Sequence, residues 1–221
     1  MSAAVIIVAA GLGKRFHSKV PKQFLNLSGK PVFLWSVLAF QKIKEFTQVI
    51  VVVPEKYAPR LRTYEKKHRL DVTSGGKERY DSVMAGLKKV RAGIDFVAIH
   101  DAARPLITKD IIAKCLREAK RSGAALVAVA AKDTVKKAGS NLLVEKTIQR
   151  NTVWLAQTPQ IFRKNLLLKA YSRKFTSITD DAQAVELSGK KPKIVPGRYS
   201  NIKITEPLDM KIAALLLKGR N

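Results

Sequence analysis

The chain has 221 residues, of which 46% are hydrophobic, so it is long enough and apolar enough to fold around a substantial core rather than stay disordered. No apolar run approaches the length of a membrane span, and we expect no signal peptide before the first strand pattern. The single cysteine excludes an internal disulfide, and these features together predict a cytoplasmic protein.

The formal net charge of +25 is typical of proteins that bind nucleic acids, because Lys and Arg number 42 against 17 Asp and Glu. The basic residues, however, are spread along the whole chain and form no tail or block. Aromatic residues make up only 7% and do not alternate with basic ones, as they do where bases stack on a protein surface. We therefore favour a basic solvated surface that attracts anionic small molecules, and keep nucleic acid binding as the alternative of a different class.

Strand and helix patterns alternate along the chain, which is typical of a mostly parallel sheet with helices on both faces and predicts the α/β class. Short apolar runs predict strands at residues 5–8, 49–53, 70–73, 96–99, 124–131 and 193–195. Apolar spacings of three and four predict helices at residues 31–40, 57–68, 80–90, 108–119, 164–173, 180–189 and 206–217. Thr108 and Thr205 are expected to cap two of these helices, and Asp180 with Asp181 a third.

One stretch breaks this alternation. Residues 134–146 have the pattern of a β-hairpin, with its turn at residues 138–141. An isolated hairpin cannot bury its own apolar side chains, so a second subunit is its expected neighbour. We expect one domain over residues 1–221, with 134–150 as a protruding β-arm that forms a dimer. Cys115 is expected in the core, and Trp154 in the core or against the arm.

The first predicted strand is followed by a loop suited to a phosphate group. Small residues run from Ala9 to Gly13 around one leucine, and they let a ligand approach the backbone N–H groups closely. The loop lacks the third glycine of a dinucleotide fingerprint and the Gly-Lys-Ser/Thr ending of a P-loop, so an ordinary turn is the alternative interpretation. Basic residues that would lie along a polyphosphate come next: Lys14, Arg15, Lys19 and Lys22.

Two further loops follow predicted strands, and in an open α/β sheet such loops meet at the carboxyl ends of the strands. In the first of them, Gly75 and Gly76 permit close approach of a ligand to the backbone. Ser82, one turn into the next helix, is suited to a hydrogen bond with a base or a sugar. A plain glycine-rich turn before a helix has the same pattern.

The other loop is His100-Asp101-Ala102-Ala103-Arg104-Pro105. Asp101 ends a strand among phosphate-binding loops, which makes it a natural Mg²⁺ ligand, since Mg²⁺ takes one or two carboxylates plus phosphate oxygens. Arg104 can bind a second phosphate. His100 either orients the loop or takes part in catalysis, and the orienting role is favoured.

Short motifs in the same order along almost the whole chain carry a resemblance to a known family. They are Ala9-Ala10-Gly11-Leu12-Gly13-Lys14-Arg15, Pro21-Lys22-Gln23-Phe24, Gly75-Gly76-x-x-Arg79-x-x-Ser82-Val83, His100-Asp101-Ala102-Ala103-Arg104-Pro105, Asp133-Thr134-Val135-Lys136, Arg150-Asn151-x-x-Trp154-x-x-Gln157-Thr158-Pro159-Gln160, Thr179-Asp180-Asp181-Ala182 and Asn201-Ile202-Lys203-Ile204-Thr205. Together they resemble the 2-C-methyl-D-erythritol 4-phosphate cytidylyltransferase family. The resemblance implies a single Rossmann-like nucleotidyltransferase domain that acts in the non-mevalonate isoprenoid pathway.

The resemblance implies that CMP passes from CTP to methylerythritol phosphate with Mg²⁺, in a homodimer whose arm crosses to the partner. Arg15 and Lys22 would stabilise the transition state at the α-phosphate, and Arg150 and Lys203 would serve catalysis by fixing the attacking phosphate. The residues implied to surround CTP are Ala9, Ala10, Gly11, Gly76, Lys77, Ser82, Asp101 and Ala102. The residues implied to hold the sugar phosphate are Arg104, Thr134, Arg150 and Lys203. Of these, Thr134 and Arg150 would come from the other subunit.

A sister cytidylyltransferase that acts on ribitol or ribulose 5-phosphate is the nearest alternative. Such enzymes look similar in the first loop and in the Asp-Ala-x-Arg-Pro segment. The segment from His100 to Pro105 and the run Arg150-Asn151-x-x-Trp154 favour the methylerythritol enzyme.

Overall fold

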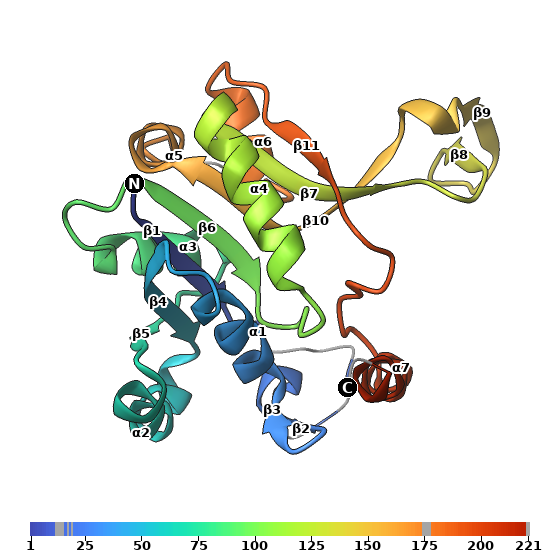
Figure 1. The fold of residues 1–221 in the computed structure, drawn as a ribbon. Helices are drawn as coiled ribbons and strands as arrows, with labels where there is room; N and C mark the ends of the chain where they lie inside the picture. Colours follow the sequence, from blue (N-terminus) through green and yellow to red (C-terminus); the bar gives the residue numbers. More distant parts are fainter. Residues whose placement is uncertain (12–15, 17, 19, 174–177, 220–221) are drawn as a thin grey trace.

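The structure, a computed structural model, describes residues 1–11, 16, 18, 20–173 and 178–219. Its centre is a seven-stranded sheet in the order β11-β7-β10-β6-β1-β4-β5 (Figure 1). Only β10 runs antiparallel to its neighbours in this sheet, which confirms the predicted α/β class. The strands are β1 (Ala3–Val8), β4 (Phe46–Val53), β5 (Asp71–Ser74), β6 (Phe96–Asp101), β7 (Ala124–Ala130), β10 (Trp154–Arg163) and β11 (Lys193–Pro196).

Helices cover both faces of the sheet because consecutive side chains of a strand point to opposite sides. On β1, Val5 and Ile7 pack with the helices on one face, while Ala4 and Ile6 pack with those on the other. The helices of the first face are α1 (Val32–Gln41), α2 (Ala58–His68) and α4 (Lys109–Ser122). Those of the second face are α3 (Arg79–Lys89), α5 (Lys164–Tyr171) and α6 (Asp181–Leu187).

The last helix, α7 (Pro207–Lys218), lies apart from these two layers (Figure 1). It belongs to a small separate cluster that also contains Leu27, Leu106 and Ile204. Leu27 is part of a short hairpin that the sequence did not predict, β2 (Asn26–Leu27) with β3 (Lys30–Pro31). The cluster places the segment before α7 beside the loop that follows β6.

Two details of the helix ends differ from the sequence prediction. Thr205 does not cap α7, because Glu206 is the N-cap and forms a capping box with Asp209. The backbone N–H and hydroxyl of Thr205 instead donate to the Asp209 carboxylate, each at 2.7 Å. Thr108 is the N-cap of α4 as expected, but its hydroxyl donates to the carboxylate of Asp110 rather than satisfying the helix backbone.

The predicted hairpin is present and extends away from the sheet, beyond β7 and β10 (Figure 1). It consists of β8 (Val135–Ala138) and β9 (Val144–Ile148), and its tip exposes 85% of Leu142 and 68% of Leu143. Cys115 is buried in the core as predicted, whereas Trp154 is 39% exposed at the start of β10, so the expectation of a core position is wrong for the single chain. Among the described residues, no helix is long and apolar enough to span a membrane.

Candidate active site

The three loops singled out in the sequence meet at one edge of the sheet. They follow β1, β5 and β6, which run parallel within the order β6-β1-β4-β5. The first two loops touch, because a Cβ added to Gly75 would lie 2.7 Å from the Cβ of Ala10 and 2.6 Å from Oγ of Ser82. The third is tied to β1 by the N–H of Ala102, which donates to the carbonyl of Val8 at 3.1 Å. This edge is where α/β sheets bind ligands.

Asp101 is the centre of the charges at this edge. Its Oδ1 accepts a hydrogen bond from Nη1 of Arg79 at 2.9 Å, and its Oδ2 lies 2.9 Å from Nζ of Lys203. Nε of Arg104 lies 3.7 Å from the same Oδ2. Burial by itself would raise the pKa of Asp101, but the charges of Arg79 and Lys203 lower it well below the ordinary value. The carboxylate is therefore ionised at neutral pH, and cations surround it.

Arg79 belongs to the Gly75-Gly76-x-x-Arg79 motif, but the sequence did not predict it as a site residue. It is the first residue of α3, and its Nη2 donates to Oδ2 of Asp181 at 2.5 Å. Asp181 is fully buried and also accepts a hydrogen bond from the hydroxyl of Tyr171 at 2.6 Å. Although burial opposes its charge, the two aspartates raise the pKa of Arg79. The cap prediction holds for Asp180, whose Oδ1 accepts from the N–H of Gln183, while Asp181 points into the core.

Asn201 fastens the segment that carries Lys203 to the rest of the site. It begins the motif that contains Lys203, but the sequence did not predict it as a site residue. The side chain of Asn201 is fully buried, and its Nδ2 donates to Oε1 of Gln157 at 3.0 Å and to the carbonyl of Thr158 at 3.1 Å. The backbone carbonyl of Asn201 accepts a hydrogen bond from Nη1 of Arg104 at 2.8 Å. These bonds bring Lys203 and Arg104, about a hundred residues apart in the sequence, to the same carboxylate.

His100 is held in a neutral state that orients the loop. Its Nε2 lies 3.2 Å from the carbonyl of Arg104, which can only accept, so Nε2 carries the proton. Its Nδ1 then accepts from the hydroxyl of Thr158 at 3.1 Å, and that oxygen accepts from the N–H of Asp101 at 3.0 Å. Burial lowers the pKa of His100 from 6.5 to about 4. This favours the orienting role over acid–base catalysis.

The buried neutral His100 predicts that the protein loses stability as the pH falls from about 6.5 to about 4. In this range the unfolded chain binds a proton that the folded chain does not, so the free energy of unfolding decreases by up to about 1.4 kcal/mol per pH unit. Urea titrations at several pH values should show a shallower slope for His100→Asn than for the parent protein. His68 is unchanged in both proteins and contributes equally. Equal slopes would contradict the assignment.

The remaining predicted site residues are not among the cations around Asp101 described above. Lys22 lies in a turn near the start of α7. Burial would raise the pKa of Asp209, but hydrogen bonds from Thr205 lower it, and the positive charge of Lys22 adds to this lowering. Ser82 is 2% exposed and its hydroxyl donates to the carbonyl of Glu78 at 3.2 Å, whereas Lys77 is exposed. Arg15 lies outside the described residues.

Thr134 and Arg150 do not join the cluster within one chain. Both lie at the base of the arm and are exposed. Nη1 of Arg150 donates to the carbonyl of Lys132 at 2.7 Å, and in the described part of the chain no hydrogen bond or ion pair joins it to Asp101. The expectation that these two residues act on another subunit therefore stays a prediction.

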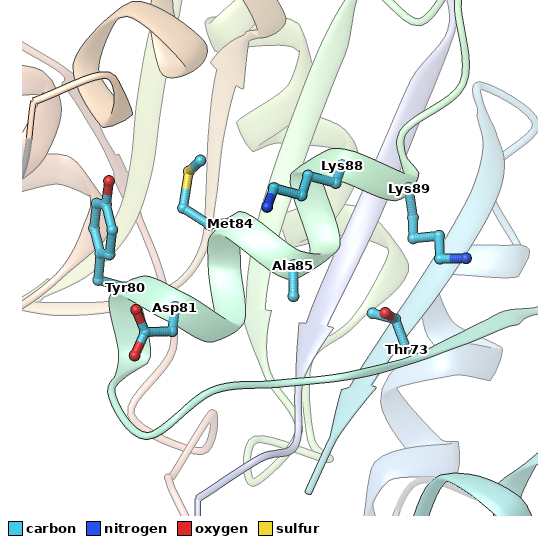
Figure 2. Close-up of a pocket in the computed structure, with 7 residues that line it drawn as sticks. All are labelled: Thr73, Tyr80, Asp81, Met84, Ala85, Lys88 and Lys89. Atoms are coloured by element: carbon cyan, nitrogen blue, oxygen red, sulfur yellow. The ribbon is translucent and has the colours of Figure 1, made fainter. Parts of the chain in front are cut away.

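A surface cavity of about 460 Å³ lies elsewhere, along the outer side of α3 (Figure 2). Tyr80, Met84 and Lys88 project into it from the helix, and Thr73 borders it from β5. None of the predicted site residues lines this cavity, so it is not the candidate active site.

The fold and the site define an α/β nucleotidyltransferase: a mostly parallel sheet, a loop of small residues after strand β1, and cations gathered at the end of the neighbouring strand β6. Comparison with known families identifies which one. The model of the family described as 2-C-methyl-D-erythritol 4-phosphate cytidylyltransferase matches residues 3–219, and the chain belongs to this family.

Relatives agree over the full length of the chain. A 2-C-methyl-D-erythritol 4-phosphate cytidylyltransferase of Endomicrobium trichonymphae is 49% identical over 99% of this chain and all of its own. A crystal structure of the enzyme of the same name from Thermus thermophilus is 31% identical, with a TM-score of 0.83, and covers 99% of this chain and all of its own. A 4-diphosphocytidyl-2C-methyl-D-erythritol synthase from Anaerococcus prevotii is 29% identical with a TM-score of 0.86, and the match covers 98% of each chain.

Proposed function

We propose that this protein transfers CMP from CTP to 2-C-methyl-D-erythritol 4-phosphate, which gives 4-diphosphocytidyl-2-C-methyl-D-erythritol and pyrophosphate in the non-mevalonate isoprenoid pathway. The observation that carries this proposal is the family match over residues 3–219. The cluster of Arg79, Arg104 and Lys203 around Asp101 supplies the positive charge that joining two phosphate substrates requires.

The reaction needs charge neutralisation more than it needs a base. An oxygen of the methylerythritol phosphate attacks the α-phosphorus of CTP, and the bond from that phosphorus to the β-phosphate oxygen breaks, so pyrophosphate leaves. The attacking group is already an anion, and no proton has to be removed from it. The difficulty is to bring a dianion to a polyanion, and positioning and cations supply most of the catalysis in such transfers.

The described loops suit the two halves of this reaction. The backbone of Ala9 to Gly11 and the Gly75-Gly76 pair lie together and offer close approach to CTP, and Lys22 would bind the α-phosphate in the transition state with Arg15. Arg104 and Lys203 share Asp101 and would bind the attacking phosphate. Gly76, Lys77, Ser82 and Ala102 complete the proposed CTP site, of which Ser82 is turned toward its own helix here.

The chemistry of Asp101 fits Mg²⁺. Among the described residues no group of three or more His, Cys, Asp and Glu side chains gathers to hold a metal, and Asp101 is the carboxylate that ends β6 at this edge. Mg²⁺ usually takes one or two carboxylates and completes its shell with water and substrate phosphates, which this site allows. Asp101 would hold the ion beside the CTP phosphates, where it would withdraw charge from the α-phosphate. Because Nζ of Lys203 lies 2.9 Å from Oδ2 of Asp101, the lysine would have to move away from that oxygen before the ion could bind it.

We also propose a homodimer in which each arm, residues 134–150, supplies Thr134 and Arg150 to the other subunit. The exposed apolar tip and the position of Arg150, at the base of the arm and outside the Asp101 cluster, support this arrangement. Mixing two inactive variants tests it. Lys22→Ala and Arg150→Ala subunits, unfolded and refolded together in equal amounts, should recover about a quarter of the parent activity, because half of the dimers would contain one intact composite site. Recovery of no activity from folded dimers would contradict arm exchange.

Pyrophosphate release tests the main proposal. With CTP and Mg²⁺, methylerythritol 4-phosphate should support release, and ribitol 5-phosphate and ribulose 5-phosphate should not. Release with a pentose or pentitol phosphate alone would keep the mechanism and change the substrate. Absence of release with all three, from folded protein, would overturn the proposal and favour the basic surface and salt-sensitive nucleic acid binding.

A further inference from the structure

A buried glutamine closes the base of the first loop. Gln23 is 3% exposed, and its Nε2 donates to the carbonyl of Ala9 at 2.5 Å and to the carbonyl of Gly11 at 2.9 Å. Ala9 and Gly11 open the loop after β1, and Gln23 lies at its far end, just after Lys22. One amide group therefore joins the two ends of the loop that we propose to bind CTP.

These two bonds also set the direction of the loop backbone. In a trans peptide the C=O and the N–H of the next residue point in opposite directions. Because the carbonyl of Ala9 points at Gln23, the N–H of Ala10 points away from it. A backbone arranged in this way presents a donor to a ligand on the far side, which is how loops of small residues bind phosphate.

Gln23 is itself held firmly. It lies in the short turn Lys22–Phe24, where the N–H of Phe24 donates to the carbonyl of Pro21 at 2.9 Å. The ring of Phe24 packs 4.7 Å from the ring of Tyr57 and 6.1 Å from that of Phe33, measured between centroids. The turn is thereby anchored to α1 and to the start of α2, and Gln23 transmits that anchoring to the loop.

We infer that Gln23 is a positioning residue: it holds the backbone of Ala9 to Gly11 at a fixed separation from Lys22. The nucleotide contacts and the lysine at the α-phosphate then form one rigid unit before CTP binds. The inference rests on the proposed function in taking CTP as the nucleotide and Lys22 as the cation at its α-phosphate.

Two substitutions test this role, and the chain offers a matched control. Gln23→Met keeps the length of the side chain and removes both donors, and Gln23→Glu replaces the donor with an oxygen that the two carbonyls repel. Gln48 is a comparable buried glutamine in β4, and it binds the carbonyl of Lys89 at 2.9 Å, the carboxylate of Asp71 at 2.7 Å and the N–H of Arg91 at 3.0 Å. Gln48→Met therefore damages the fold without touching the loop.

Both Gln23 variants should bind CTP·Mg²⁺ at least about tenfold more weakly by calorimetry and turn over at least about tenfold more slowly, because small displacements of positioned groups have effects of this size. KM for methylerythritol phosphate should change by less than about threefold, since Arg104 and Lys203 are held by Asn201. Gln48→Met should lose thermal stability but keep CTP affinity. CTP affinity equal in Gln23→Met and Gln48→Met would overturn the inference.

A measurement without substrate separates this inference from the proposed function. Backbone amides of Ala10 and Gly11 should exchange with solvent at least about tenfold faster in Gln23→Met than in Gln48→Met, because the loop loses its anchor. Faster exchange would support the positioning role even if the parent protein released no pyrophosphate. Equal exchange would contradict it even if the parent were a fully active enzyme.

Discussion

Replacing Lys22 with alanine is expected to lower turnover by about 10²- to 10³-fold while the fold is kept. In the mechanism that we propose, Lys22 meets the charge that develops on the α-phosphate and on departing pyrophosphate, and a group that acts mainly in the transition state affects kcat more than KM. Its side chain is only partly buried and lies outside the three apolar clusters, so the thermal midpoint should change little.

The measurement is kcat at saturating CTP and methylerythritol phosphate, with the circular dichroism spectrum and melting temperature recorded for each protein. Lys30→Ala is the control, because Lys30 is an exposed lysine in the neighbouring hairpin, with its Nζ 4.8 Å from the ring centroid of Trp35. The control should retain parent activity. Turnover of Lys22→Ala within a few-fold of the parent would remove Lys22 from the mechanism.

Replacing Arg79 with methionine is expected to lower the free energy of unfolding by about 3–5 kcal/mol, the usual cost of leaving one partner of a buried ion pair uncompensated. Asp101 would keep Lys203 and Arg104, but among the described residues fully buried Asp181 would keep only the hydrogen bond from Tyr171. The unpaired charge of Asp181 is therefore the main source of the loss.

Urea denaturation should show this loss, and adding Asp181→Asn to Arg79→Met should restore part of it by removing the buried charge. Arg91→Met is the matched control, because Arg91 pairs with Asp71 at 3.6 Å on the surface, where its side chain is 65% exposed. Such a pair contributes about 0–1 kcal/mol. A loss no larger for Arg79→Met than for Arg91→Met would show that the buried network does not stabilise the fold.

Much of the fold follows from local pattern. Strands β1, β4 and β6 are buried on both faces, so they appear in the sequence as continuous apolar runs, and the helices appear through their spacing. The insertion of antiparallel β10 between β6 and β7 could not be predicted in this way, because strand order depends on contacts between distant segments. The β2–β3 hairpin was also missed, since each of its strands has only two residues.

The candidate site divides in a similar way. Asp101 and Arg104 could be predicted because Asp101 ends a buried strand and Arg104 lies on the loop that follows it. The place of Lys203 came from family resemblance, and the structure brings it to Asp101. The pairing of Arg79 with Asp181 could not be predicted, because the partners lie 102 positions apart and charged residues near helix ends are usually solvated. That Asp181 is buried, and therefore needs Arg79 as a partner, becomes visible only in the folded chain.

The position of α7 has a consequence for how the molecule opens. Lys203 enters the site on a segment that leads into α7, and α7 packs in a small cluster of its own rather than on the main sheet. Regions with few buried apolar contacts unfold locally at a lower free energy than the core. Local unfolding that detaches α7 would carry away Lys203, the lysine that we propose for the acceptor phosphate, while the loops at the ends of β1 and β5 stay in place. If the proposed sites hold, the two substrates bind to cooperative units of unequal stability, and we expect acceptor binding to be lost before CTP binding.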